Sequence, residues 1–461
     1  MPSRRRFLLT TMILVLLVAF FIFLAFSEFS RNGPNPSSRF MLTKAIVLNG
    51  TLSIDKSEVD YYSGLDYAMK NGTYYLDKAP GLSFLSIPFY FVGNELYKAG
   101  VVLPKNDAFN YGGDSNGFFF IILFTTLASA FGVMKFYETL RLLDFSQKVS
   151  ISSAFIFALA TLYFVFSSSL FSHSFLAAVL IFSIYELLKY QKSRARSNIL
   201  LSGTAFGIAI TIEYTIIIFL PIFLLYMLGK TRKIVVAKKY LQFFAPVAAI
   251  GLLLVVYNTA TFGCPTCLSY NYSAFIDTQK FDHDIRDGLY VLLVSTYRGI
   301  FFFNPALILA VPGFYFLYKR REHEAIFFAL IITSQVLLIS GYSYLTGGLS
   351  YGPRHLIAII PFMMFFAAAA LQYMPRRPVF FAIVAALVAV SAFHTFIGRY
   401  TSPVAGPESV QNPIYDFALQ ELMQNKHNNF WLKNNVTIFY LLIFAAVFFG
   451  VILLKKTFVG R

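Results

Sequence analysis

The acidic residues of this chain are concentrated between its first two hydrophobic stretches. Nine of the 22 acidic residues fall within positions 28–114. They include Asp55, Asp66 and Asp77, and Lys78 directly follows the last of these. A membrane protein that gathers carboxylates in one loop beside the bilayer usually has a use for them there. We therefore place the chemistry, which would be carboxylate chemistry, in this segment.

The composition is typical of a polytopic membrane protein. Hydrophobic residues make up 57% of the chain, charged residues 13%, and the mean hydropathy is +0.65. These values lie far from those of a soluble domain. A net charge of +16 could indicate nucleic-acid binding, but the basic residues lie in short links between hydrophobic stretches. This placement argues against nucleic acid and favours membrane lipids as partners.

The basic links follow the positive-inside rule, which places them in the cytoplasm. They are residues 4–6, 189–196, 230–239, 319–321, 376–377 and 455–461. Counting from an inside N-terminus, we expect about twelve spans in a multi-pass protein of the cell membrane, with both termini cytoplasmic. The spans are predicted near 7–27, 117–140, 149–167, 172–190, 199–212, 214–229, 240–258, 299–318, 324–341, 355–372, 378–397 and 436–454.

Two stretches test this count. Residues 7–26 follow three arginines, as in a signal peptide, but the run is long and lacks a small-x-small cleavage site. We interpret it as an uncleaved first helix. Residues 199–229 form an apolar run of 31 residues between basic clusters, whereas two ordinary spans need about 40. Either two short helices meet at Glu213, or a re-entrant hairpin turns there.

The long loops all fall on the predicted outer side. They are residues 28–116, 168–172, 259–298, 342–354 and 398–435, and the four Asn-x-Ser/Thr sequons lie on that side as well. The cytoplasmic links are short and contain no P-loop or dinucleotide fingerprint. A pump driven by ATP is therefore disfavoured, and the absence of a long internal repeat weakens a secondary-transporter interpretation.

Local patterns predict mixed structure in the first outer loop. Residues 40–48 have helical spacing with Asn49-Gly50 as a stop signal. Residues 51–54 and 73–76 are expected to be extended, and residues 66–69 are expected to form a helical turn. Residues 80–98 are amphipathic and aromatic, which is typical of a helix lying at the membrane interface.

A set of short motifs occurs along most of the chain in a fixed order. They are Asn35-x-x-Ser38-Arg39, Ile54-Asp55, Asp66-x-Ala68, Gly72-x-Tyr74-Tyr75-x-Asp77-Lys78-Ala79-Pro80-Gly81, Phe171-x-His173, Glu213-Tyr214, Asn258-x-x-x-Phe262-Gly263, Tyr297-Arg298-Gly299-x-Phe301 and Gly347-Gly348-x-Ser350-Tyr351-Gly352-Pro353-Arg354. The ordered set resembles the GT-C superfamily of integral membrane glycosyltransferases, in the branch of the dolichyl-phosphate-mannose protein mannosyltransferases and aminoarabinose transferases. The resemblance implies one all-α transmembrane domain over residues 1–461, with residues 28–116 as the outer loop that carries the site.

The resemblance implies sugar transfer from a polyprenyl phosphate to an acceptor lipid, glycan or protein on the extracytoplasmic side. Such a transfer needs a carboxylate to take the acceptor proton and cations to hold the departing phosphate. Many relatives carry an Asp-Glu pair shortly before the position of Arg39, where this chain has residues 36–38, Pro-Ser-Ser. We therefore assign the base to Asp66 first, with Asp77 and Asp55 as alternatives.

Lys78 and Arg354 are the main candidates for phosphate contacts. Lys78 precedes Pro80, which fixes the backbone at the membrane edge. Arg354 follows three glycines and a proline, a loop that lets a guanidinium approach a phosphate through two nitrogens. The alternative is that both are interface cations that snorkel to the surface.

Five further residues are expected to contact the substrate, because of the motifs they belong to or their positions at the outer ends of predicted spans. They are Arg39, His173, Glu213, Arg298 and Tyr351. His173 lies in a tight outer turn and Glu213 at the outer end of a short span, where an ionisable group is a functional candidate. Structural roles remain the alternative for each of them.

We expect no cofactor and no metal ligands, although residues 282–284, Asp-His-Asp, have a spacing found in divalent-cation sites. Cys264 and Cys267, the two cysteines of the chain, can form a disulfide.

The main alternative function is a lipid or glycolipid transporter or flippase. A transporter needs ionisable groups at the bilayer midplane, whereas a transferase keeps them on its outer loops. The predicted spans are almost free of charge, which favours the enzyme.

Overall fold

The computed structural model describes residues 2–29, 33–60, 66–103, 112–228, 233–274, 280–375, 377–401 and 410–459. Helices dominate this part of the chain, and its one sheet is a two-stranded hairpin. The prediction of an all-α membrane fold is confirmed, and short strands do occur in the first outer loop.

Each predicted span contains helix. The helices are α1 (Pro2–Ala25), α5 (Gly112–Leu142), α6 (Gln147–Leu159), α8 (Ser172–Ser193), α9 (Arg196–Ile212), η2 (Tyr214–Phe219) with α10 (Leu220–Leu228), α11 (Lys233–Phe262), α13 (Ile300–Phe303) and η5 (Pro305–Leu309) with α14 (Ala310–Tyr318), α15 (Glu322–Ser340), η6 (Arg354–Ile359) with α16 (Ile360–Tyr373), α17 (Pro378–Thr401) and α20 (Val436–Leu454). Within the described residues, eight helices are long and apolar enough to cross a bilayer, and three shorter apolar helices accompany them. The total of about twelve spans stays a prediction.

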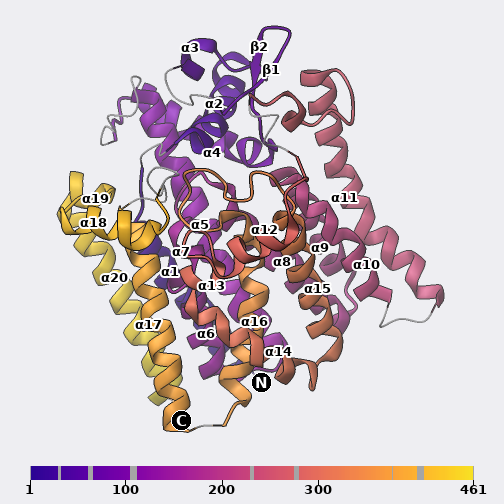
Figure 1. Cartoon of the computed structure of the whole chain (residues 1–461), viewed down its shortest axis with the longest axis vertical. Coiled ribbons are helices and arrows are strands. Elements are labelled where there is room, and N and C mark those ends of the chain that lie inside the picture. The colour runs from indigo at the N-terminus through magenta and orange to yellow at the C-terminus, as the bar shows by residue number, and fades with distance from the viewer. Residues whose placement is uncertain are drawn as a thin grey trace.

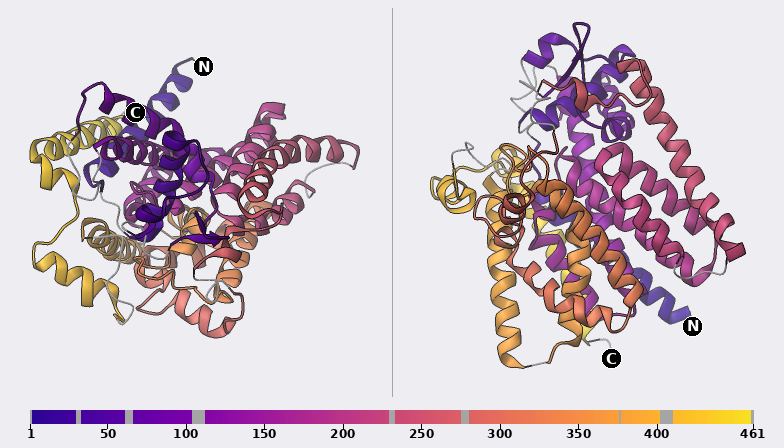
Figure 2. Two further views of the ribbon diagram at one scale, coloured as in Figure 1. Left: turned by 90° about the horizontal axis from the view of Figure 1, so that it is seen from above. Right: turned by 45° about the vertical axis from the view of Figure 1, so that its right-hand side comes forward.

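The helices pack as a bundle whose two ends differ (Figure 1). Helix α5 lies against α1, α4 and α8, while α9 lies between α8 and α11. The elements of the first outer loop gather at one end, and both chain termini lie at the opposite end (Figures 1 and 2). This arrangement agrees with termini on a common side of the membrane.

The first outer loop folds as three helices and a hairpin. They are α2 (Pro34–Asn49), α3 (Lys56–Glu58), β1 (Ala68–Lys70), β2 (Thr73–Tyr75) and α4 (Gly81–Lys98). Helix α2 ends at Gly50, whose φ of 65° is the left-handed stop that the sequence predicts. The predicted amphipathic helix over residues 80–98 is present as α4.

The helical turn expected over residues 66–69 is wrong. Ala68–Lys70 form β1, which pairs antiparallel with β2. Asn71 and Gly72 between the strands have φ angles of 50° and 78°, the geometry of a tight hairpin turn. The Asn71-Gly72 turn therefore makes the preceding residues a strand instead of a helical turn. Of the expected extended piece over residues 51–54, Ile54 forms a bridge to Tyr74.

A buried ion cluster attaches this loop to the bundle. Lys44 on α2 lies 2.8 Å from Asp114 on α5 and 2.5 Å from Glu58. Tyr90 on α4 donates a hydrogen bond of 2.6 Å to the same Asp114. Two of the nine acidic residues in the segment are thus structural partners of one lysine.

The chain also turns at Glu213 between two short helices, as one of the two alternatives for residues 199–229 predicts. Helix α9 ends at Ile212, Glu213 is extended, and η2 begins at Tyr214. The side chain of Glu213 is therefore placed at the turn itself.

The bundle depends on close approach of α14 and α16 at Gly313. A Cβ atom there would collide with the backbone oxygen of Phe366. We expect Gly313→Ala to force the helices apart and lower the melting temperature in detergent, because overpacking costs about 1–3 kcal/mol. Gly450→Ala in α20 is the control, since a Cβ atom there meets nothing within 4 Å. Equal melting temperatures for the two variants would contradict this account of the packing.

Candidate active site

Seven of the ten predicted site residues line one cavity at the outer-loop end of the bundle. We call it the polar cavity. Its lining comes from α2, the segments on either side of the β-hairpin, the first turn of α8, the turn at Glu213, the 3-10 turn η3 (Ser269–Tyr272), the loop that follows α15 and the start of η6. The residues are Asn35, Arg39, Asp66, Asp77, Lys78, His173, Glu213, Tyr270, Tyr342, Tyr344, Arg354 and His355.

One wall of the polar cavity carries two carboxylates that share a lysine. The Nζ atom of Lys78 lies 2.7 Å from Asp66 and 2.6 Å from Asp77. Burial raises the pKa of the Asp77 carboxyl, an effect that the nearby Lys78 and Arg39 charges oppose. The Asp66 side chain is 21% exposed and that of Asp77 only 5%. Asp66 is therefore the more exposed of the two carboxylates that line the cavity.

Arg39 enters the cavity from α2. It donates to Asn35 Oδ1 one helical turn earlier and, over 3.2 Å, to Ser172 Oγ at the start of α8. Its Nε atom is buried and has no hydrogen-bond partner among the described residues. Burial lowers the pKa of this guanidinium, and Glu213 is the largest of the charges that oppose the shift. Arg39 thus keeps an unused donor in the site.

Arg354 reaches the cavity because Gly347 makes room for it. A Cβ atom on Gly347 would lie 2.7 Å from Arg354 Nε, and the φ of 68° at Gly347 also favours glycine. The guanidinium lies over the ring of Phe171, 5.7 Å from its centroid. Arg354 Nε is buried and unpartnered within the described part of the chain.

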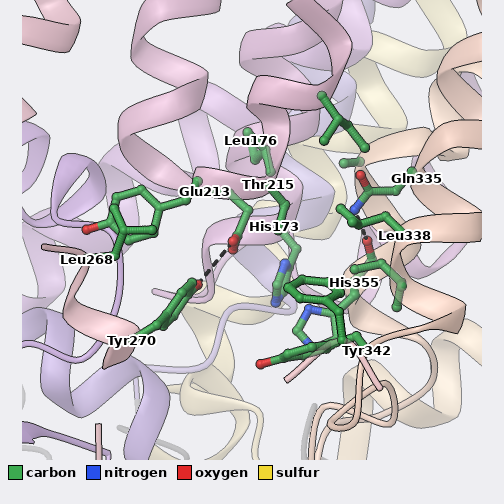
Figure 3. A pocket seen from close by; sticks show the side chains of 15 residues that line it. His173, Leu176, Glu213, Thr215, Leu268, Tyr270, Gln335, Leu338, Tyr342 and His355 are labelled. Atoms are coloured by element: carbon green, nitrogen blue, oxygen red, sulfur yellow. Dashed lines mark hydrogen bonds between the residues drawn. The ribbon is translucent and has the colours of Figure 1, made fainter. Parts of the chain in front are cut away.

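Two histidines also line the polar cavity. The rings of His173 and His355 lie edge to face with centroids 5.7 Å apart (Figure 3). Gln335 fixes the backbone of His355 through a hydrogen bond of 3.1 Å to its carbonyl oxygen. The Nε2 atoms of both rings are buried and lack a partner among the residues that the structure describes. Each arginine Nε–H is a fixed donor, and each histidine Nε2 can donate in the tautomer that carries its proton there, so an anion in the cavity could use all four.

Glu213 and Tyr270 face each other where the polar cavity meets a second, apolar cavity (Figure 3). Tyr270 donates a hydrogen bond of 3.1 Å to Glu213, and its pKa is raised, first by burial and then by the Glu213 charge. The two cavities share His173, Glu213, Tyr270, Tyr342 and His355. The further lining of the second cavity is mostly apolar, with Thr215 and Gln335 as polar members; the apolar residues include Leu176, Ile218, Leu268, Phe281, Leu338 and Ile339.

The sequence did not single out Asn35, Tyr270, Tyr342, Tyr344 or His355 as site residues. His355 directly follows Arg354, and Asn35 stands in the motif that ends at Arg39, so both had a signal. Nothing in the sequence marks the three tyrosines as site residues, because the chain contains 29 tyrosines. Only the packing of distant loops places these three in the cavity.

Three predicted residues lie outside the polar cavity. Asp55 is exposed and caps α3 by accepting a hydrogen bond of 2.8 Å from the backbone of Ser57. Contacts with Ser57, its side chain first, lower the pKa of Asp55. Tyr351 is buried and donates a hydrogen bond of 2.8 Å to the backbone oxygen of His394.

Arg298, the third, supports the loop that carries Arg354. Its guanidinium donates to the carbonyl oxygens of Thr346 and Gly348 over 3.0 and 2.7 Å. It also stacks on Tyr297 at 3.9 Å from the ring centroid. These bonds fix the peptides on both sides of Gly347. Arg298 is thus a positioning residue in this structure.

The side chains of residues 282–284 have separate partners. Asp282 accepts a hydrogen bond from Ser343, His283 lies 2.9 Å from Asp287, and Asp284 caps the helix α12 (Ile285–Leu293). Among the described residues, no group of three or more His, Cys, Asp or Glu side chains is arranged to hold a metal ion. Cys264 and Cys267 form a disulfide.

The chain is similar to known membrane glycosyltransferases. Residues 114–258 match the model of the dolichyl-phosphate-mannose-protein mannosyltransferase family. A search of curated protein sequences finds no match.

Solved structures extend the likeness to nearly the whole chain. The archaeal oligosaccharyltransferase AglB from Archaeoglobus fulgidus, in complex with an inhibitory peptide and a dolichol-phosphate, is 12% identical with a TM-score of 0.56 over 88% of this chain. ArnT from Cupriavidus metallidurans, bound to undecaprenyl phosphate, is 15% identical with a TM-score of 0.53 over 97%. The chain spans 57% of AglB and 76% of ArnT. Residues 114–258 thus match this mannosyltransferase family, and the likeness to the solved structures shows a shared fold over nearly the whole chain.

Proposed function

We propose that this protein transfers a sugar from a polyprenyl-phosphate donor to an acceptor at the polar cavity. The observation that carries the proposal is a set of four buried nitrogens, unpartnered among the described residues, in the cavity that the Asp66–Lys78–Asp77 cluster also lines; they belong to Arg39, His173, Arg354 and His355. The structures of AglB with dolichol-phosphate and ArnT with undecaprenyl phosphate support the donor class. The cavity's place at the end opposite the termini supports an extracytoplasmic site.

The four nitrogens fit the phosphate of the donor. As the bond from the anomeric carbon to the phosphate oxygen breaks, negative charge grows on the leaving group. Arg39 and Arg354 each retain an Nε–H donor for this charge, and donors fixed before the reaction stabilise it without reorganising. Charge-assisted hydrogen bonds of this kind are about twice as strong as neutral ones.

The apolar cavity fits the polyprenyl chain. It begins at His173 and His355 and continues among Leu176, Leu338 and other apolar side chains. A lipid whose phosphate is held by Arg354 could therefore place its first isoprenoid units there, out of water. A few convergent polar groups at the mouth of an apolar pocket are typical of sites for amphipathic ligands.

Asp66 is the proposed base. The acceptor hydroxyl would give its proton to the Asp66 carboxylate as its oxygen attacks the anomeric carbon, and polyprenyl phosphate would leave with the electron pair of the broken bond. Lys78 would orient Asp66 through their ion pair of 2.7 Å, and the buried Asp77 would hold Lys78 in place. This role of Lys78 differs from the direct phosphate contact that the sequence suggests. The ammonium group of Lys78 already pairs with both carboxylates.

The transporter alternative receives no specific support. The ionisable groups of the polar cavity lie on the outer loops and at helix ends, where a transferase would need them, and not midway along the spans.

The first prediction concerns the donor. Arg354→Ala should weaken binding of the lipid-phosphate sugar far more than binding of the acceptor. Losing a charge-assisted hydrogen bond costs about 1.5–3 kcal/mol, which is roughly tenfold to more than a hundredfold in affinity. Titration of purified protein with donor and with acceptor measures both. An unchanged donor affinity would remove Arg354 from the site.

The second prediction concerns the loop. Gly347→Ala should weaken donor binding by about tenfold, because the added Cβ displaces the Arg354 guanidinium. Gly50→Ala is the matched control: its φ of 65° imposes the same backbone strain, but its Cβ would meet nothing within 4 Å. Similar donor affinities in the two variants would show that Gly347 does not position Arg354.

The third prediction concerns the base. Asp66→Asn keeps the size of the side chain but removes its basicity, so transfer should fall by about 10²–10⁴ while the protein still folds. Asp55→Asn is the control, because Asp55 caps α3 away from the cavity. Near-normal turnover in Asp66→Asn, with loss in Asp77→Asn, would move the base to Asp77. Mass spectrometry of membrane glycans from a deletion strain would identify the acceptor class.

A further inference from the structure

A second charged pocket lies at the opposite end of the bundle from the polar cavity. It forms where α5 and α8 end and α15 begins, and we call it the basic pocket. Its lining includes Leu142, Gln191, Lys192, Arg194, Arg321 and Glu324. Helix α8 places His173 in the polar cavity at one end and Lys192 in the basic pocket at the other. At 1.5 Å per residue these two positions are about 30 Å apart, so the pockets are separate sites.

Two cations from different helices converge on one exposed carboxylate beside this pocket. Lys192 lies 3.6 Å from Asp144, Arg321 contacts the same Asp144, and the Asp144 side chain is 68% exposed. Lys192 and Arg321 also donate to the carbonyl oxygens of Leu142 and Leu143, over 2.5 and 3.1 Å. The carbonyl bonds hold both cations in position at the end of α5.

The basic pocket also has groups that nothing in the described chain satisfies. Arg194 is exposed, and its described contact is with the ring of Tyr190, 5.9 Å away. Both the Oε1 and Nε2 atoms of Gln191 are buried without a hydrogen-bond partner among the described residues. A ligand with negative charge and additional polar groups would use Arg194 and Gln191 together.

An apolar groove adjoins the basic pocket between α10 and α15. Leu225 and Leu330 line it and are 58% and 41% exposed. Tyr226 in the groove donates a hydrogen bond of 3.1 Å to Glu324, which lines the basic pocket. The hydrogen bond between Tyr226 and Glu324 therefore joins the two sites. The apolar groove lies on the Tyr226 side, and the cations of the basic pocket lie on the Glu324 side.

We propose that this place binds an anionic glycerophospholipid of the leaflet on the side of the termini. Its phosphate would lie against Lys192, Arg194 and Arg321, polar headgroup atoms would meet Gln191, and an acyl chain would lie in the groove. Basic pockets between membrane helices bind anionic headgroups in this way. The site does not depend on the proposed transfer reaction, because none of its residues lines the polar cavity.

The test compares short-chain phosphatidylglycerol with phosphatidylcholine as ligands of the delipidated, full-length protein. Native mass spectrometry and the ligand-induced rise in melting temperature report binding. Phosphatidylglycerol should bind more tightly, and Arg194→Gln should weaken it about fivefold, the effect of one surface cation. Arg194→Gln should fold normally, because the Arg194 side chain is exposed and makes no described hydrogen bond, and the backbone bond from Arg194 to Tyr190 does not need the side chain.

Lys189→Gln is the matched control, because Lys189 lies on the same helix and is 43% exposed but does not line the pocket. It should leave phosphatidylglycerol binding unchanged. Three results would overturn the proposal: equal binding of the two lipids, equal loss in the two variants, or a full shift in melting temperature with inorganic phosphate alone. The last result would identify a site for free anions.

Discussion

Buried arginines that donate to backbone carbonyl oxygens hold the irregular segments of this protein in place. Arg399 on α17 bonds the carbonyl oxygens of Phe26 and Val165 over 2.7 and 2.9 Å, and the Oγ atom of Ser168 over 2.6 Å. Arg298 does the same for the loop around Gly347. Carbonyl groups outside regular helices lack partners, and near a bilayer an unpaired one costs several kcal/mol. A guanidinium with five donors satisfies several of them at once.

The consequence is that loops and helix ends, together with Arg39 on α2, can carry the candidate site. The segment clamped by Arg399 leads to Phe171, Ser172 and His173, which support Arg354, bond Arg39 and line the polar cavity. Arg39 and Arg354 differ from the two clamping arginines in one respect. Their Nε atoms remain buried without partners in the described structure. The unpartnered Nε atoms set Arg39 and Arg354 apart from Arg298 and Arg399; Arg141 has one as well, but it lies on α5 outside the polar cavity and donates to the carbonyl oxygen of Phe145.

The carboxylates divide in a similar way. Glu58 and Asp114 bind Lys44, and Asp55 caps a short helix, so these groups are satisfied within the protein. Asp66 and Asp77 also share a lysine, but they do so at the wall of a cavity. Their single lysine faces two negative charges. This position at the cavity wall is the geometric basis for proposing Asp66 as the base.

The sequence by itself determined the membrane class, the spans that contain helix, and the segment between the first two spans that holds Asp66, Asp77 and Lys78. Those properties follow from hydrophobic length, basic links and turn residues, which act locally along the chain. Tertiary structure alone decided which ionisable residues share a cavity. Arg298 and Arg354 occur in similar glycine-containing motifs, yet one bonds carbonyl oxygens and the other keeps a free donor, because their loops pack against different neighbours. Tyr270, Tyr342 and Tyr344 enter the site for the same reason: contacts between segments far apart in the chain place them there.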